Sequence, residues 1–128
     1  MMVALLLLVS GLAEGMMDWL QFRLNVCHPM YKDQFWSPDY SWKNKWNIDP
    51  ATGRILGEKF FLSSTLFVGF TDGWHLMKLV RNLFMFTGIL YIAICDMTVS
   101  EAIINVILAR IMYGVGFSLS FSWMHKYL

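Results

Sequence analysis

The chain has 128 residues, which is enough for a single domain. Hydrophobic residues make up 57% of the chain and charged residues 15%, against roughly 25% charged in an average soluble domain. A soluble core of this size could not bury so much apolar surface, so the composition excludes an ordinary water-soluble fold. The formal net charge of +1 gives no broad basic field, so we expect no nucleic-acid partner.

The first predicted helix covers residues 2–22. Its apolar part resembles a secretory signal peptide, but no basic residue precedes the run Val3–Val9, so we expect it to be retained as a membrane span. Polar residues recur every three or four positions along this segment and therefore share one helical face. Glu14 and Asp18 are the charged residues of that face.

Residues 23–59 are predicted to form a polar, aromatic connector. This segment contains all three prolines, six of the ten Lys and Arg residues, and Trp36, Trp42 and Trp46. Trp and Lys side chains together are typical of a loop on the lipid headgroups, with rings inward and ammonium groups outward. A nucleic-acid surface would also combine basic and aromatic residues. Four acidic residues dilute the charge of this connector, which favours the headgroup interpretation.

Residues 60–99 allow two interpretations. In the first, spans at 60–77 and 83–99 are joined by a tight turn, because Phe60–Phe70 and Leu83–Val99 are both apolar. In the second, one long helix continues through the polar residues between them, because no proline interrupts that stretch. We expect the last span to cover 101–124.

The last predicted span carries two charged residues and two rows of small residues. Arg110 lies inside the span, and Glu101 lies near its start, where the helix dipole favours a carboxylate. Small residues at a spacing of four let helices approach closely in lipid. The first row is Gly114, Ser118 and Ser122, and the second is Gly116 and Ser120.

The sequence therefore predicts one all-α domain over residues 1–128, a polytopic bundle of three to four transmembrane helices. Hydropathy favours four spans, with 60–77 marginal. The distribution of basic residues favours three, because four spans would place Lys78 and Arg81 outside the cell. In both cases the basic connector 23–59 is expected in the cytoplasm and the N-terminus outside.

Two cysteines, Cys27 and Cys95, are too far apart in sequence to form a metal-binding Cys-x-x-Cys pair. The sequence leaves open whether they form a disulfide. The redox compartment of the protein is therefore open as well.

Four ionisable residues in or beside apolar helices are the strongest candidates for a site. A charge inside a bilayer costs at least about 2.5–3.5 kcal/mol, so such groups need partners. Glu14 and Asp18 are one helical turn apart, and so are Asp72 and His75. Two facing helices with such pairs can hold a divalent metal. We therefore predict Glu14, Asp18, Asp72 and His75 as metal ligands, with Asp18, Asp72 and His75 as catalytic candidates.

The alternative is a purely structural cluster. Arg110 would then neutralise Asp18 or Asp72 in an ion pair that holds the bundle together. The spacing Asp-x-x-His is short and common, so it does not decide between a structural and a catalytic role.

Two stretches of the chain resemble a group of small, uncharacterised bacterial and phage membrane proteins. They are Ser41–Trp46, which reads SWKNKW, and Gly57–Leu76, which includes TDGWHL. A weaker similarity surrounds Asp18. The resemblance implies a membrane location and draws attention to Asp18, Asp72 and His75, and it implies no activity.

Two classes of function fit these observations, and we rank a membrane component first. Such a chain would form a homo-oligomer or join a larger membrane complex through the small-residue face of its last helix, and an assembled bundle could enclose an ion or proton channel. The second is a membrane-embedded metalloprotein or enzyme acting on a lipid-like substrate.

Overall fold

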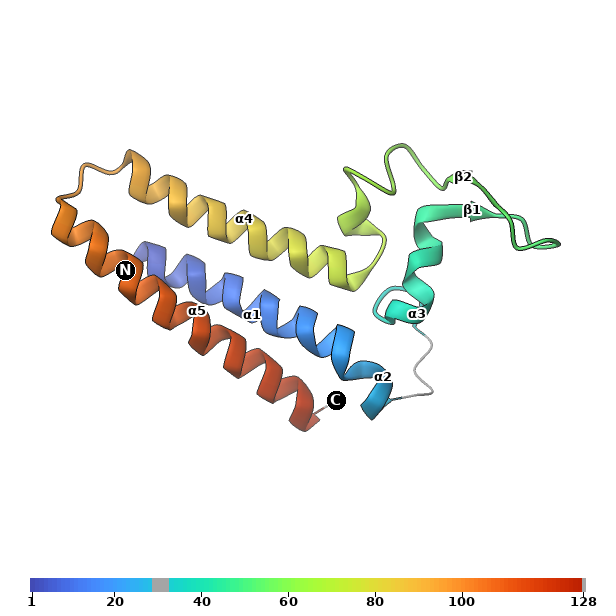
Figure 1. The fold of residues 1–128 in the computed structure, drawn as a ribbon, viewed down its shortest axis with the longest axis horizontal. Coiled ribbons are helices and arrows are strands. Elements are labelled where there is room, and N and C mark those ends of the chain that lie inside the picture. Colours follow the sequence, from blue (N-terminus) through green and yellow to red (C-terminus); the bar gives the residue numbers. More distant parts are fainter. Residues whose placement is uncertain (29–32, 128) are drawn as a thin grey trace.

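Three long helices and a folded connector make up the protein in the computed structural model, which describes residues 1–28 and 33–127 (Figure 1). The long helices are α1 (Met2–Phe22), α4 (Gly73–Ile94) and α5 (Val99–Tyr127). The shorter elements between α1 and α4 are α2 (Leu24–Cys27), α3 (Pro38–Ser41), η1 (Trp42–Lys45), β1 (Trp46–Ile48), β2 (Ile55–Glu58) and η2 (Val68–Phe70). The predicted first helix, 2–22, is confirmed at both ends.

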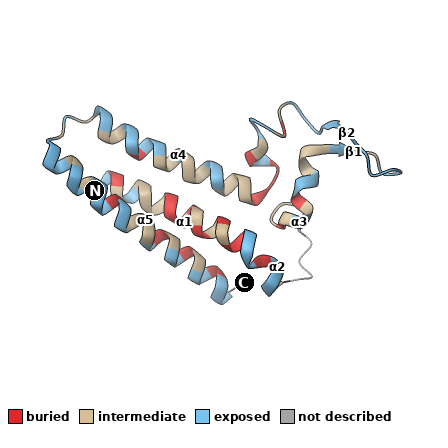
Figure 2. Ribbon diagram, viewed as in Figure 1, coloured by how far each residue is buried: buried red, intermediate tan, exposed pale blue. Residues whose placement is uncertain are grey.

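Helix α1 is the centre of the bundle. It packs against both α4 and α5, whereas those two helices make few direct contacts with each other among the described residues. The chain runs up, down and up, so α4 is antiparallel to α1 and α5 is parallel to it (Figure 1). Within the most apolar stretch of each helix, 44% of α1 is buried, against 6% of α4 and 11% of α5 (Figure 2).

Glycines bring α1 and α5 together until their backbones touch. A Cβ atom on Gly11 would overlap the carbonyl oxygen of Tyr113, and one on Gly116 would overlap the carbonyl oxygen of Leu8. A Cβ on Gly15 would collide with Ser120 and with the backbone of Phe117. Of the two rows of small residues predicted on the last helix, Gly116 and Ser120 are therefore used inside the chain. Such close approach is how helices pack without a hydrophobic driving force in lipid.

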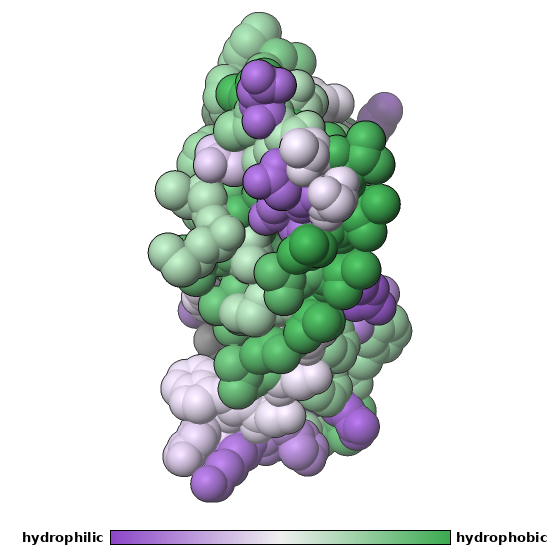
Figure 3. Space-filling view, turned by 90° about the vertical axis from the view of Figure 1, so that its left-hand side faces the viewer, coloured by the Kyte–Doolittle hydropathy of each residue, from purple (hydrophilic) through white to green (hydrophobic). Residues whose placement is uncertain are grey.

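All three long helices are long and apolar enough to cross a membrane. About 20 residues are needed to cross the hydrocarbon layer, and α1, α4 and α5 have 21, 22 and 29. The outer faces of α4 and α5 expose large side chains such as Leu83, Ile94 and Ile104. Green hydrophobic residues form a continuous area on the end view in Figure 3. Length, composition and exposed apolar surface together indicate a membrane protein with three candidate spans.

The four-span interpretation is wrong for the described chain. Residues 60–72 form turns and the short helix η2, and no long helix covers 60–77. The predicted helix 83–99 begins ten residues earlier, at Gly73, and ends at Ile94. The polar residues 72–82 are thus the beginning of a span and not a turn between two spans. Helix α5 extends the predicted 101–124 by a few residues at each end.

The connector contains a small antiparallel hairpin, so the protein is mostly helical but not purely all-α. Strand β1 pairs with β2, with Trp46 opposite Glu58. A turn after β2 places Leu62 at a positive φ of 54°, which costs a residue with a Cβ atom about 1–2 kcal/mol. The Glu58 carboxylate holds this turn by accepting hydrogen bonds from the Leu62 backbone N–H and from Ser64. The hydrogen bonds from Ser64 lower the pKa of Glu58.

The two cysteines are both free thiols. Cys27 is exposed at the end of α2, next to the connector, and Cys95 follows α4 in the loop to α5. These positions lie at opposite ends of the helical bundle (Figure 1), so an intramolecular disulfide between them is excluded by distance.

We expect Gly11→Ala to destabilise the bundle, because the new methyl group overlaps the backbone of Tyr113. Overpacking of this kind typically costs about 1–3 kcal/mol. Thermal unfolding in a mild detergent measures the effect. Gly114→Ala is the matched control, since a Cβ there meets nothing closer than 3.7 Å. Equal melting temperatures for the two variants would contradict the close α1–α5 contact.

Candidate functional site

Asp72 begins helix α4. Its backbone is extended, with φ −155° and ψ 155°, and its carboxylate accepts a hydrogen bond from the His75 backbone N–H at 2.8 Å. This is the N-cap arrangement that Asp favours, because the first N–H groups of a helix have no partner within the helix. The carboxylate is only 5% exposed, so it must find further donors inside the protein.

Those donors come from His75 and Lys45. His75 Nδ1 lies 2.8 Å from both carboxylate oxygens of Asp72, and Lys45 Nζ lies 3.3 Å from Oδ2. A nitrogen so close to a carboxylate oxygen needs a proton between them, so Nδ1 of His75 carries the proton. The ring is then fixed in orientation, with Nε2 as its remaining nitrogen. We call Lys45, Asp72 and His75 the connector latch.

The connector delivers Lys45 to this position through several backbone anchors. The Lys45 carbonyl oxygen accepts hydrogen bonds from the Ser63 hydroxyl at 2.7 Å and from the Lys59 N–H at 3.0 Å. The neighbouring Asn44 donates to the Thr71 carbonyl oxygen at 2.9 Å, one residue before Asp72. The connector therefore folds back onto the start of α4 and is fastened there by a charged group.

Gly73 provides the closest contact between the connector and α4. The ring of Trp36 lies directly against this glycine, where a Cβ atom would overlap it. The Gly73 N–H donates to the Phe35 carbonyl oxygen at 2.8 Å. A glycine is therefore needed at the first position of α4 because Trp36 occupies the space of a side chain.

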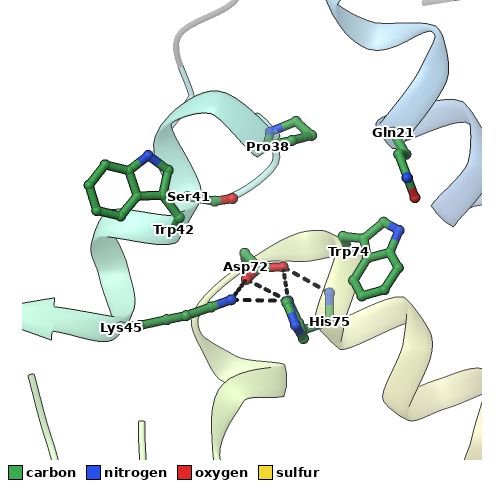
Figure 4. A pocket seen from close by; sticks show the side chains of 8 residues that line it. All are labelled: Gln21, Pro38, Ser41, Trp42, Lys45, Asp72, Trp74 and His75. Carbon is green, nitrogen blue, oxygen red and sulfur yellow. Dashed lines mark hydrogen bonds and ion pairs between the residues drawn. The ribbon is translucent and has the colours of Figure 1, made fainter. Parts of the chain in front are cut away.

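A cleft of about 310 Å³ opens beside the latch (Figure 4). Gln21 of α1, Trp42 of η1 and Trp74 of α4 form part of its wall, so three separate elements meet there. An imidazole held by a carboxylate is suited to general acid–base chemistry. The same contacts also hold the connector against α4. Of the three predicted catalytic residues, the site brings together Asp72 and His75 but not Asp18. Asp18 has no hydrogen bond or ion pair to Asp72 or His75 in the described chain.

Glu14 has a different partner from the one expected. Arg81 Nη1 donates to Glu14 Oε2 at 2.6 Å, between the middle parts of α4 and α1. Ser10 donates to the Arg81 carbonyl oxygen at 3.0 Å, and Arg81 also contacts Asn82 Oδ1. Sequence reasoning missed Arg81 because the four-span interpretation, which hydropathy favoured, placed this residue in a turn between two spans. Once 73–94 is read as one helix, Glu14 and Arg81 become two opposite charges inside facing spans.

The predicted four-residue metal site is not assembled. Within residues 1–28 and 33–127, no three His, Cys, Asp or Glu side chains gather in a way that could hold a metal ion. The reason is geometric, since Asp72 and His75 pair with Lys45 while Glu14 pairs with Arg81. Asp18 lies on α1 one turn beyond Glu14 and is half-buried.

Arg110 does not form the predicted ion pair with Asp18 or Asp72. Among the described residues the ion pairs are Lys45–Asp72, His75–Asp72 and Arg81–Glu14. The Arg110 side chain is exposed and lies over the ring of Tyr113, 5.9 Å from the ring centroid. The lack of a side chain on Gly114 leaves room for this guanidinium, which comes within 3.7 Å of a Cβ built there.

We expect Asp72→Ala to free the connector from α4. The substitution removes an N-cap, worth about 0.5–2 kcal/mol, and leaves Lys45 without its carboxylate partner. Hydrogen exchange should accelerate both in the first turn of α4 and around Lys45. Asp39→Ala is the control, because this exposed carboxylate contacts Asn25 alone among the hydrogen bonds described for its side chain. Unchanged exchange at Lys45 in Asp72→Ala would contradict the latch.

The chain was also compared with known proteins, and no family model, curated protein or solved structure matches it. The resemblance of SWKNKW and TDGWHL to small bacterial and phage membrane proteins therefore stays a prediction. Any function assigned to the chain rests on its own residues and their geometry.

Proposed function

We propose that the protein is a component of a larger membrane complex, and that the groove between α4 and α5 receives a transmembrane helix of a partner. The observation that carries this proposal is Arg110, an exposed charge within an apolar span. A charge at this depth costs at least about 2.5–3.5 kcal/mol in lipid. A partner that supplies a carboxylate would remove most of that cost.

Two guanidinium groups, Arg81 and Arg110, lie near the single carboxylate of Glu14. Tyr113 is close enough to Glu14, Arg81 and Arg110 for all three charges to act on its hydroxyl group. Two of these groups are guanidinium ions and one is a carboxylate, while Asp18, the other carboxylate of α1, lies one turn beyond Glu14 and further from Arg110. Arg81 uses the carboxylate at 2.6 Å. Arg110 is therefore the member that lacks an anion.

The groove beside Arg110 has the character of a helix-docking surface. It has a volume of about 330 Å³, and α1 forms its floor because α4 and α5 make few direct contacts with each other. Apart from Arg110, its wall is almost entirely hydrophobic, with Leu7 on α1, Ile89 on α4 and Val106 on α5. An apolar helix with one acidic residue matches this surface in both polarity and charge.

A row of small residues begins beside Arg110 and continues along the outward face of α5, outside the groove. Gly114, Ser118 and Ser122 follow Arg110 at intervals of four, and both serines are exposed. Gly116 and Ser120 face α1, so the row of Gly114, Ser118 and Ser122 is the one that is free for another helix. Small residues would let that helix approach α5 closely, next to Arg110.

A second parallel copy does not supply the missing carboxylate. Gly11 lies beside Tyr113, and from Gly11 to Asp18 the helix rises about 10 Å away from Arg110. Glu101 lies about 13 Å from Arg110 in the other direction. Glu14 is nearer but is held by Arg81. The partner is therefore a different polypeptide with an Asp or Glu near the middle of its span.

The orientation proposed from the sequence suits this three-span arrangement. The connector carries six Lys and Arg residues, and Lys126 near the C-terminus lies at the same end of the bundle (Figure 1). The loop 95–98 at the other end has none. Since basic loops stay in the cytoplasm, the connector and the C-terminus are cytoplasmic and the N-terminus is outside.

A defined peptide tests the partner proposal. A Leu/Ala transmembrane peptide with one central Glu should bind the protein in vesicles, as measured by energy transfer, more tightly than the same peptide with Gln. A polar contact between helices in lipid contributes about 1 kcal/mol, which is roughly a fivefold change in affinity. Arg110→Leu should abolish the preference for Glu, and the control Arg54→Leu in the exposed connector should keep it. Equal binding of both peptides, or a symmetric dimer that covers the groove, would refute the proposal.

The two native cysteines test the orientation. In intact cells, a membrane-impermeant maleimide should label Cys95 in the variant Cys27→Ser. Cys27 in the variant Cys95→Ser should react only after the membrane is permeabilised, because it lies at the connector end. The opposite pattern would show that the connector faces outward.

A further inference from the structure

The segment 60–70, between the hairpin and α4, is inside out compared with a loop in water. Its buried residues are Ser63 and Gly69, whereas its large apolar side chains are exposed, with Phe61 at 77%. No charged residue occurs in the segment. Soluble proteins rarely leave so many apolar side chains together on the surface, so this apolar face must have another surrounding than water. It consists of Phe60, Phe61, Leu66, Phe67 and Phe70.

The polar groups of this segment are turned inward, towards the connector. The Glu58 carboxylate accepts hydrogen bonds from the backbone N–H groups of Leu62 and Ser64. The Ser63 hydroxyl donates to the Lys45 carbonyl oxygen at 2.7 Å. Further N–H groups bond to carbonyl oxygens within the segment, namely those of Ser63, Thr65, Phe67 and Phe70. Internal satisfaction of backbone groups is what a segment needs where water is scarce.

Contacts with α4 place the segment beside a candidate span. The short helix η2, the yellow-green turn just before α4, packs against α4 on the side away from α1 (Figure 1). A Cβ atom built on Gly69 would lie 3.1 Å from Leu79 Cδ2 and 3.7 Å from the His75 carbonyl oxygen. Leu79 lies six residues after Gly73, which is about 9 Å along the helix. The segment is therefore level with the first two turns of α4.

The residues of α4 at this level are typical of a membrane boundary. Lys78 is exposed, and its Nζ lies 5.0 Å from the ring centroid of Trp74. Trp residues gather between the hydrocarbon and the headgroups, and Lys side chains extend from there towards water. Leu79, Leu83 and Phe86 share one face of α4 and are all exposed. The apolar face of residues 60–70 is thus continuous, through Leu79, with the face of α4 that meets lipid.

We propose that residues 60–70 form a shallow membrane anchor, whose apolar face is inserted into the lipid leaflet at the connector end of the bundle. Lipid fits this face better than a further protein does, because lipid already surrounds α4 at the same level and the face carries no charge for a partner to recognise. Lys59, just before the segment, is exposed and suits the phosphate groups above it. Turns and one short helix cannot cross the hydrocarbon layer, so the anchor stays at its boundary.

The anchor accounts for the apolar run Phe60–Phe70, which favours a span in the sequence but forms none in the fold. It does not depend on the proposed partner helix, because no residue of 60–70 lines the Arg110 groove. Either proposal can therefore fail while the other stands.

Spin labels on single cysteines measure the depth of the segment. Cys27 and Cys95 are replaced by Ser, and Phe61→Cys or Phe70→Cys is labelled in vesicles of phosphatidylcholine and phosphatidylglycerol that contain no other protein. We expect both labels to collide more often with oxygen, which dissolves in lipid, than with a water-soluble nickel chelate. Their depth should be about 5–10 Å into the boundary between headgroups and acyl chains. Thr52→Cys, in the exposed turn of the hairpin, is the control and should show the reverse preference.

The other outcomes are distinct. If the nickel chelate reaches both labels more easily than oxygen does, the segment lies in water and the proposal is wrong. If neither reagent reaches them, a second copy of the chain covers the face, which also overturns the proposal. A fluorophore on the same cysteines gives an independent reading, since lipids brominated near the ester group should quench it and should not quench one on Thr52→Cys. Leu66→Cys, at another exposed position, replaces either variant that fails to reconstitute.

Discussion

Contact between the backbones of α1 and α5 determines how the rest of the bundle is arranged. Gly11 and Gly15 on α1 meet the backbone of α5, and Gly116 on α5 meets the backbone of α1. This contact uses one side of α1 completely, so α4 can approach only from another side. Helices α4 and α5 therefore make few contacts with each other, and a groove remains between them. In lipid, where apolar surfaces gain little by meeting, such close van der Waals packing is a principal source of association.

The arrangement also decides which charges can neutralise one another. With α5 on its glycine face, α1 presents Glu14 and Ser10 to α4, where Arg81 meets both. This pair places two opposite charges together between two candidate spans and leaves Arg110 without an ion pair among the described residues. That outcome is a consequence of packing, because Glu14 is held by Arg81 and the other acidic residues of α1 and α5, Asp18 and Glu101, are not level with Arg110. An exposed arginine within an apolar helix is also the observation on which the proposed partner helix rests.

The connector end of the molecule contains both the latch and a cavity. The latch of Lys45, Asp72 and His75 fastens the connector to α4, and Trp36 packs against Gly73. The same Trp36 lines a cavity of about 370 Å³ to which α1, α2 and α5 also contribute. A folded connector thus forms one wall of a pocket at the membrane boundary.

The sequence by itself determined the membrane character, the first helix and the last helix, because long apolar runs leave few alternatives to a spanning helix. It also identified Asp72 and His75 as a pair, since residues three apart on a helix share a face. It did not determine whether 60–77 is a span, because a short apolar stretch fits a turn-rich segment equally well. The tertiary structure alone decided that Arg81 pairs with Glu14, that Lys45 reaches Asp72, and that Arg110 is left over. Those partners are far apart in the chain, and their distances depend on how the helices pack, which no local pattern records.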